Sequence, residues 1–242
     1  MNKKNQLELE INKKTIIDNK KKLIENYGPY KDIDIISTLM PYLRLFELFN
    51  IKPIRILELG SGFGYSTRYL SLIAEEVIGL DYFNEAIEHA RSLSKNIKNI
   101  NFLFKDIFKD EIGIEQFDLV FCSNFHPLYR DYYKDNDDQK KNYDLIIDKI
   151  YNSITKDGYL VISHIETKKQ NIDIEKHTLN KFSKLVYEVD ERALYVFDFL
   201  FRAIKSKRLI ILSIIVISIF RKTFFKLKFI KNYKPIWLLK KI

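Results

Sequence analysis

A glutamate and three glycines occupy every second position of the stretch Glu58-Leu59-Gly60-Ser61-Gly62-Phe63-Gly64. All four could contribute to a ligand-binding site. A short β-rich run, 54–59, leads into this stretch, and a helical pattern through Leu70 follows it. Glycines at a strand-to-helix turn let the backbone bend sharply and approach a ligand without a Cβ in the way. The unpaired N–H groups that begin the next helix favour an anionic group on that ligand.

A carboxylate, Asp81, ends the next predicted strand, 77–80. Acids at that place commonly accept hydrogen bonds from ribose hydroxyls. The two features together predict a nucleoside-containing cofactor at the carboxyl ends of the strands. A dinucleotide is disfavoured, because its fingerprint requires a small residue three positions after the second glycine. Tyr65 occupies that position here.

The motif Glu58-x-Gly60-x-Gly62-x-Gly64 resembles the first motif of class I S-adenosylmethionine-dependent methyltransferases. In that family the glycine loop touches the methionine part of the cofactor, and the acid after the second strand holds the ribose. The resemblance covers roughly residues 50–200. It implies a Rossmann-like fold and S-adenosylmethionine as the cofactor.

The resemblance also suggests residues on the adenine side of the cofactor. Asp106, after the third strand, resembles the family's acid near the adenine amino group, with Ile107 beside the ring; Lys105 and Lys109 could instead pair with Asp106. Tyr82 could stack on adenine or pack against the protein. The implied cofactor-binding residues are Glu58, Gly60, Ser61, Gly62, Gly64, Asp81, Tyr82, Asp106, Ile107 and Ser123.

We expect the acceptor to lie past the fourth strand, in segment 123–133. His126 is a candidate general base there, because an unperturbed pKa of about 6.5 suits proton removal near neutrality. His164, near the end of the fifth strand, is a weaker candidate, and either could be an ordinary loop histidine. The family's metal-dependent members carry a carboxylate where Cys122-Ser123-Asn124 has none, so no metal is expected. Cys122 is expected to be a small buried residue.

The elements that must position these residues alternate between strands and helices, which predicts an α/β fold with a mostly parallel sheet and helices on both faces. Helical spacing of Tyr42, Leu45, Phe46 and Phe49 predicts a helix before the sheet. The remaining predicted strands are 100–104, 117–122 and 159–165, followed by an antiparallel hairpin of 184–190 with 193–199.

The chain divides by composition into an N-terminal helical or lid segment (1–50), the cofactor domain (51–200) and a basic apolar tail (201–242). From Phe199 onward there are 12 Lys and Arg and no acid, whereas the rest of the chain carries a net charge of −3. An apolar run, 209–220, would form a helix about 18 Å long, short of a bilayer core of about 30 Å. Basic and aromatic flanks, including Trp237, favour a tail lying on an anionic membrane surface. A helix packed on the core, or nucleic-acid contacts, are the alternatives.

A single cysteine and a polar N-terminus favour a cytoplasmic protein, with the tail at the inner face of the membrane. The expected activity is methyl transfer to a hydroxyl of a small-molecule, glycan or lipid-linked acceptor. One alternative is a nucleic-acid methyltransferase whose tail contacts phosphates. Another is a non-catalytic nucleoside-binding protein, against which the intact glycine loop and Asp81 argue.

Overall fold

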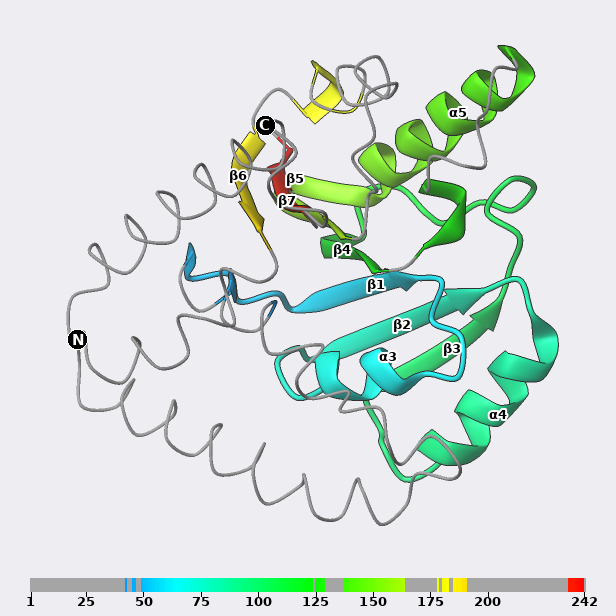
Figure 1. Cartoon of the computed structure of the whole chain (residues 1–242). Coiled ribbons are helices and arrows are strands. Elements are labelled where there is room, and N and C mark those ends of the chain that lie inside the picture. Colours follow the sequence, from blue (N-terminus) through cyan, green and yellow to red (C-terminus); the bar gives the residue numbers. More distant parts are fainter. Residues whose placement is uncertain are drawn as a thin grey trace, which may run out of the picture.

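A twisted sheet with helices on both faces forms the centre of the computed structural model (Figure 1). The structure describes residues 42, 45–46, 49–123, 125–128, 137–163, 178, 180–182, 185–190 and 235–241. Its elements are β1 (Arg55–Leu59), α3 (Tyr65–Leu70), β2 (Glu76–Asp81), α4 (Asn84–Ser94), β3 (Ile100–Phe104), β4 (Phe117–Ser123), the 3-10 turn η1 (His126–Leu128), α5 (Asp137–Ser153), β5 (Ile154–Ser163), β6 (Leu185–Asp190) and β7 (Pro235–Lys240).

The strand order in the sheet is β3-β2-β1-β4-β5-β7-β6. Strands β1 to β5 are parallel, and β7 runs antiparallel to both β5 and β6. Successive strands are therefore added on one side of β1 as far as β3, and on its other side from β4 onward. The strand order reverses between β1 and β4. Ligands of open α/β sheets bind outside the carboxyl ends of the strands at such a point. This confirms the predicted α/β class and the mostly parallel sheet.

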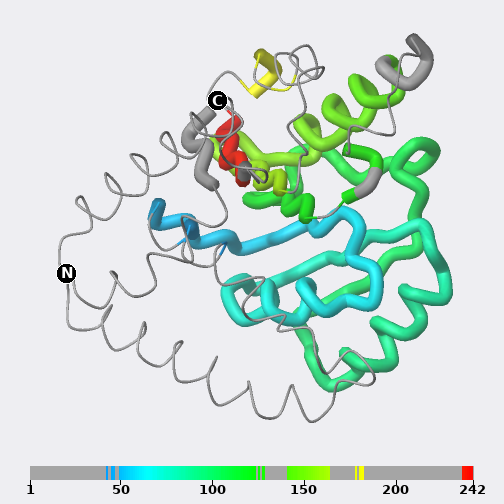
Figure 2. Tube along the Cα trace, in the orientation of Figure 1, coloured from blue at the N-terminus to red at the C-terminus, as the bar shows by residue number. Residues whose placement is uncertain are grey.

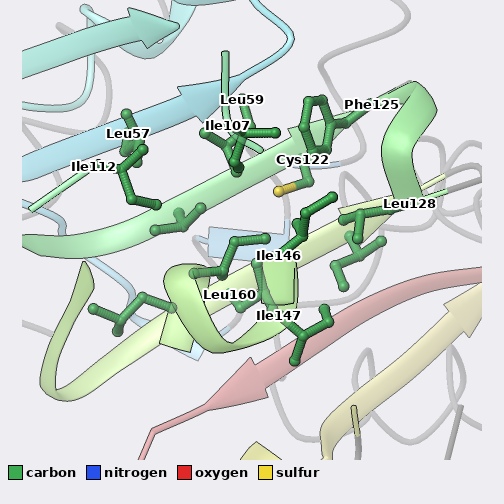
Figure 3. Packing of buried hydrophobic residues seen from close by; sticks show 14 of the residues in the cluster. Leu57, Leu59, Ile107, Ile112, Cys122, Phe125, Leu128, Ile146, Ile147 and Leu160 are labelled. Carbon is green, nitrogen blue, oxygen red and sulfur yellow. The ribbon is translucent and has the colours of Figure 1, made fainter. Parts of the chain in front are cut away.

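Alternate side chains of each strand point to opposite faces, which gives two apolar cores. On one face α5 covers the sheet, and Figure 3 shows its Ile146 and Ile147 beside Leu160 of β5. On the other face lie α3, α4 and the helical residues near the N-terminus. Buried members of that second core include Tyr42, Leu45, Phe46, Ile56, Tyr69, Leu70, Phe121 and Val161. The predicted helical state of Tyr42, Leu45, Phe46 and Phe49 is confirmed.

The C-terminal strand corrects one expectation. β6 pairs antiparallel with β7, while 193–199, the expected hairpin partner of β6, lies outside the described residues, so that pairing stays a prediction. The predicted tail included residues 235–240, but these form a strand between β5 and β6 (Figure 1). The same C-terminal residues are the red tube in Figure 2. Trp237 is only 3% exposed and packs in the core, so it cannot lie in a membrane interface.

This topology fixes where the basic segment 191–234 leaves and rejoins the sheet. Asp190 at the end of β6 pairs with Pro235 at the start of β7, and Ile236 pairs with Ser163 at the end of β5. Both anchors of the segment therefore lie at the edge formed by the carboxyl ends of the parallel strands. Among the described residues, no helix combines the length and apolar character needed to cross a bilayer.

Candidate functional site

The glycine loop is built by the hydrogen bonds of its own backbone. The N–H groups of Gly60 and Ser61 both donate to the carbonyl of Leu80 in β2, at 2.8 and 3.1 Å. The N–H of Gly62 donates to Oδ2 of Asp81 at 2.8 Å. The loop is thereby tied to the end of β2, and the glycine motif and the ribose acid predicted from the sequence are in direct contact.

Two glycines of the motif have different neighbours. A Cβ on Gly64 (φ +74°) would lie 2.5 Å from the ring of Phe102 and 2.9 Å from Cβ of Ala90, so this glycine allows β3 and α4 to pack closely. A Cβ on Gly62 (φ +51°) would meet nothing within 4 Å. The open side of the loop is therefore at Gly62, where a ligand could approach the backbone.

Ser61 adds a polar atom to this loop. Its side chain is 5% exposed, and its Oγ has no hydrogen-bond partner among the described residues. A buried unpaired hydroxyl costs about 1–3 kcal/mol. A polar ligand on the loop would remove that cost, so Ser61 and the open Gly62 both fit a bound polar group.

Asp81 is held in one orientation by the backbone. Its Oδ1 accepts the N–H of Phe83 at 2.9 Å, and its Oδ2 accepts the N–H of Gly62. Each carboxylate oxygen has a second lone pair, so both can also accept a hydroxyl proton. Tyr82, which is 71% exposed, follows Asp81 and leaves an aromatic ring available for stacking.

Glu58 lies beneath the loop and does not face its open side. The carboxylate is 1% exposed and accepts hydrogen bonds from the hydroxyls of Ser66 and Thr67 in the first turn of α3. Burial raises the pKa of Glu58 from 4.5 to about 7; the two hydroxyls oppose this shift, and the negative charge of Asp81 adds to it. Glu58 therefore joins β1 to α3 and supports the glycine loop from its buried side.

Asp106 and Ile107 are engaged by the protein itself. The Asp106 carboxylate pairs with Lys109 Nζ at 3.0 Å and accepts the N–H of Phe108, and the Lys109 hydrogen bond is the main reason its pKa is lowered. Ile107 is 3% exposed and belongs to the core. The alternative in which Lys109 pairs with Asp106 is thus the arrangement observed, and contact of either residue with adenine stays a prediction.

The acceptor side begins at the carboxyl ends of β4 and β5. Ser163 Oγ donates to Ser123 Oγ at 3.1 Å, and the Tyr42 hydroxyl lies 3.5 Å from the same Ser123 atom. The backbone of His126 is in η1, directly after this edge, but its side chain lies outside the described residues, as does all of His164. Their roles as bases stay predictions.

Ser163 is a site residue that was not expected from the sequence, and Phe125, which lies in the expected acceptor segment 123–133, has a specific packing role. A Cβ on Gly60 would lie 2.9 Å from the Phe125 ring, so the chain after β4 packs directly on the glycine loop. Ser163 ends β5 level with Ser123 at the end of β4. The predicted strands, 117–122 and 159–165, place both serines near one edge of the sheet, but only the observed register pairs them.

Cys122 and the described acids do not form further chemical sites. Cys122 is buried on the α5 side of the sheet, and burial raises the pKa of its thiol well above the ordinary value, as expected for a packing residue. Within the described ranges, no group of three or more His, Cys, Asp and Glu is arranged to hold a metal ion.

Several known proteins with similar sequence or structure are methyltransferases. Phosphoethanolamine N-methyltransferase 1 of Arabidopsis thaliana is 27% identical over 129 residues, which are 52% of this chain and 23% of that protein. The chain thus matches less than a quarter of that relative's length. Two solved structures share the fold across most of both chains. The N-methyltransferase NodS of Bradyrhizobium japonicum WM9, in complex with S-adenosyl-L-homocysteine, has a TM-score of 0.52 at 16% identity and 88% coverage of each chain.

The second structure is a SAM-dependent methyltransferase from Aquifex aeolicus, with a TM-score of 0.51, 14% identity, and coverage of 89% of this chain and 100% of that one. At these identities both likenesses concern the fold. The family model described as a methyltransferase domain matches residues 52–207, which include the glycine loop, Asp81 and the carboxyl ends of β1 to β6. Because this match spans more than half of the chain, the protein belongs to the methyltransferase domain family.

Proposed function

We propose that this protein transfers a methyl group from S-adenosylmethionine to a small-molecule acceptor. The observation that carries the proposal is the contact between the glycine loop and Asp81, with Gly62 open and Ser61 Oγ unpaired among the described residues. These groups fit a ligand that has both a polar amino-acid part and a ribose. S-adenosylmethionine has both parts, and the NodS relative was solved with its demethylated product.

In this proposal, different residues of the site contact different parts of the cofactor. Ser61 and Gly62 would contact the methionine part, and Asp81 would accept the ribose hydroxyls. Tyr82 is exposed where it could stack on the adenine. We assign Glu58, which was expected to bind the cofactor, to support of the loop, because it is 1% exposed and accepts hydrogen bonds from two hydroxyls of α3.

When bound, S-adenosylmethionine supplies a methyl group on a positively charged sulfur. A lone pair of the acceptor forms the new bond to the methyl carbon, the electrons of the broken carbon–sulfur bond stay on sulfur, and the acceptor's proton passes to a base or to water. Alignment alone can lower such a barrier by about 7–11 kcal/mol. His126 is the proposed base for a hydroxyl acceptor.

A hydroxyl of a small molecule, glycan or lipid-linked compound is the acceptor we favour. An amine is the second candidate, because two of the similar proteins are named N-methyltransferases. A neutral amine can attack before it loses its proton, so it needs no base in the transition state. The hydroxyl-lined edge at Ser123 and Ser163 is compatible with both acceptors.

We also propose that segment 191–234 brings the enzyme to an anionic membrane surface, with a nucleic-acid partner as the alternative. The segment is rich in Lys, Arg and aromatic residues. Its two anchors, Asp190 and Pro235, lie at the same edge of the sheet as the glycine loop. The segment therefore leaves and rejoins the sheet at the edge that carries the glycine loop.

The activity is tested by calorimetry and by methyl labelling. Asp81→Ala should weaken S-adenosylmethionine binding at least tenfold, whereas Glu76→Gln, at the other end of β2, should leave it unchanged. Incubation of the full chain with methyl-labelled S-adenosylmethionine and a cell extract should label the small-molecule or lipid fraction. An unchanged affinity in Asp81→Ala removes Asp81 from the ribose site, and label in nucleic acid would replace the acceptor proposed here.

A further inference from the structure

Three hydroxyl groups meet where the acceptor is expected. They belong to Tyr42, from the helical residues before the sheet, to Ser123 at the end of β4, and to Ser163 at the end of β5. The nucleoside acid Asp81 lies at the end of β2, on the other side of the point where the strand order reverses. The three hydroxyls are therefore on the acceptor side of that point.

Two of the three residues are rigidly held. Tyr42 has no exposed surface, and its ring packs edge-on against Phe121 with 5.0 Å between centroids. Ser163 is 3% exposed and is paired in register with Ser123 across the β4–β5 ladder. Ser123 is the half-buried member, so it is the hydroxyl nearest to solvent and to an incoming acceptor.

The hydrogen bonds leave Ser123 with one unused position. A serine hydroxyl can donate one proton and accept two. Ser163 donates to Ser123, which uses one lone pair. The contact with Tyr42 uses either the second lone pair or the Ser123 proton, because either oxygen can be the donor. In both arrangements one hydrogen-bonding position of Ser123 Oγ remains, and the hydrogen bond from Ser163 limits the directions in which it faces.

We propose that Ser123, held by Tyr42 and Ser163, hydrogen-bonds the nucleophilic hydroxyl or amine of the acceptor and aligns its lone pair with the methyl group. This assigns Ser123 to the acceptor instead of the cofactor, and it rests on the proposed methyltransferase function. Serine and tyrosine hydroxyls are too weakly basic to remove the acceptor's proton at neutral pH, so Ser123 is a positioning residue. Phe125, packed on Gly60, keeps the chain after β4 against the cofactor loop.

The variants that test this role change single hydroxyl groups. Ser123→Ala removes the proposed contact, Ser123→Thr retains a hydroxyl, and Tyr42→Phe keeps the ring on Phe121 but loses the oxygen. Ser153→Ala is the matched control, because Ser153 is also buried, but its hydroxyl bonds the Ile150 carbonyl at the end of α5, before β5 begins. S-adenosylhomocysteine binding is measured by calorimetry. Turnover is measured as label transferred from methyl-labelled S-adenosylmethionine to the small-molecule fraction of a cell extract.

A misplaced reacting atom can cost about a hundredfold in rate. We expect Ser123→Ala to transfer label at least tenfold more slowly with S-adenosylhomocysteine affinity within twofold of wild type. Ser123→Thr should recover most of the rate, Tyr42→Phe should be slowed severalfold, and Ser153→Ala should match wild type. If Ser123→Ala transfers label as fast as the wild-type protein, the inference is overturned. Parallel loss of affinity and rate also overturns it and makes Ser123 a cofactor residue. If wild type binds S-adenosylhomocysteine but labels nothing in any fraction, or fails to bind it, the proposed function itself fails.

Discussion

Replacing Glu58 by Gln should change how the stability of the protein depends on pH. Glu58 is buried under the glycine loop, and its pKa is raised from 4.5 to about 7, mainly by burial. An acid whose pKa is higher in the folded state binds its proton more tightly there than in the unfolded chain. Folding is therefore favoured by this group at low pH, and that contribution is lost as the pH rises through 7.

The expected size follows from the two pKa values. Each unit of difference corresponds to about 1.4 kcal/mol, so the shift amounts to roughly 3 kcal/mol when Glu58 is fully ionised. At pH 5.5 the unfolded chain has already lost most of this proton, whereas the folded protein still holds it. Between pH 5.5 and 8.5, wild type should therefore lose about 2 kcal/mol of unfolding free energy relative to Glu58→Gln. The glutamine retains groups that can hydrogen-bond Ser66 and Thr67, but it does not titrate.

Urea unfolding of both proteins without cofactor, at several pH values in this range, measures the difference directly. Other titrating groups affect both proteins equally and cancel. Glu76→Gln is the control, since its carboxylate is partly exposed in an ion pair with Arg55. A difference between wild type and Glu58→Gln that stays constant from pH 5.5 to 8.5 would refute the reasoning. So would a wild type that becomes relatively more stable as the pH rises.

Three further substitutions test the loop and the sheet. Gly64→Ala should destabilise the fold by about 1–3 kcal/mol in urea, because its Cβ would overlap Phe102 at a positive φ. Leu238→Ala should cost about 2–5 kcal/mol, because this fully buried residue of β7 packs between β5 and β6; the surface change Lys240→Gln should leave the unfolding midpoint unchanged. Ser61→Ala should not lower stability, since it removes an unpaired buried hydroxyl, yet it should weaken S-adenosylhomocysteine binding severalfold in calorimetry.

Local patterns predicted the parts of this fold that depend on local chemistry. The glycine loop and Asp81 could be recognised because a strand, a turn and a helix follow one another within residues 54–81. Their direct hydrogen bond follows from the parallel pairing of β1 with β2. The choice between adenine and Lys109 as the partner of Asp106 could not be made from the sequence. It depends on how the turn after β3 folds back on itself.

The last strand could not be found by pattern alone. β7 is buried on both faces, so its residues form a continuous apolar run instead of an alternating one. With Lys231 and Lys234 before it and Lys240 and Lys241 at its end, the run resembled the rest of the basic segment. Only its pairing with β5 and β6, which are distant in the sequence, distinguishes it as a strand of the core.

The position of β7 also determines how the membrane proposal must be tested. Ending the chain near Phe201 would remove β7 together with the basic segment, and the sheet would lose the strand that joins β5 to β6. The test therefore uses the full chain with the cations around the apolar run 209–220 changed to Gln. These are Lys205, Lys207, Arg208, Arg221 and Lys222. Each cation near an anionic surface contributes about 1 kcal/mol, so the variant should lose most of its binding.

Flotation with vesicles that contain phosphatidylserine measures this binding, and pure phosphatidylcholine vesicles are the lipid control. The matched protein control changes five exposed lysines outside the segment to Gln: Lys52, Lys95, Lys98, Lys141 and Lys156. We expect wild type and this control to float with the anionic vesicles. The segment variant should remain in the bottom fraction of the gradient. Since surface attraction is screened by salt, flotation should also weaken as salt is raised.

Equal flotation of all three proteins would show that the segment's cations do not bind the membrane. Absence of flotation for wild type would overturn the membrane proposal and leave the two alternatives, contacts with nucleic-acid phosphates and packing of the segment on the protein itself. Binding of the full chain to nucleic acid, measured at several salt concentrations, then separates these two, because only phosphate contacts give binding that weakens as salt is raised.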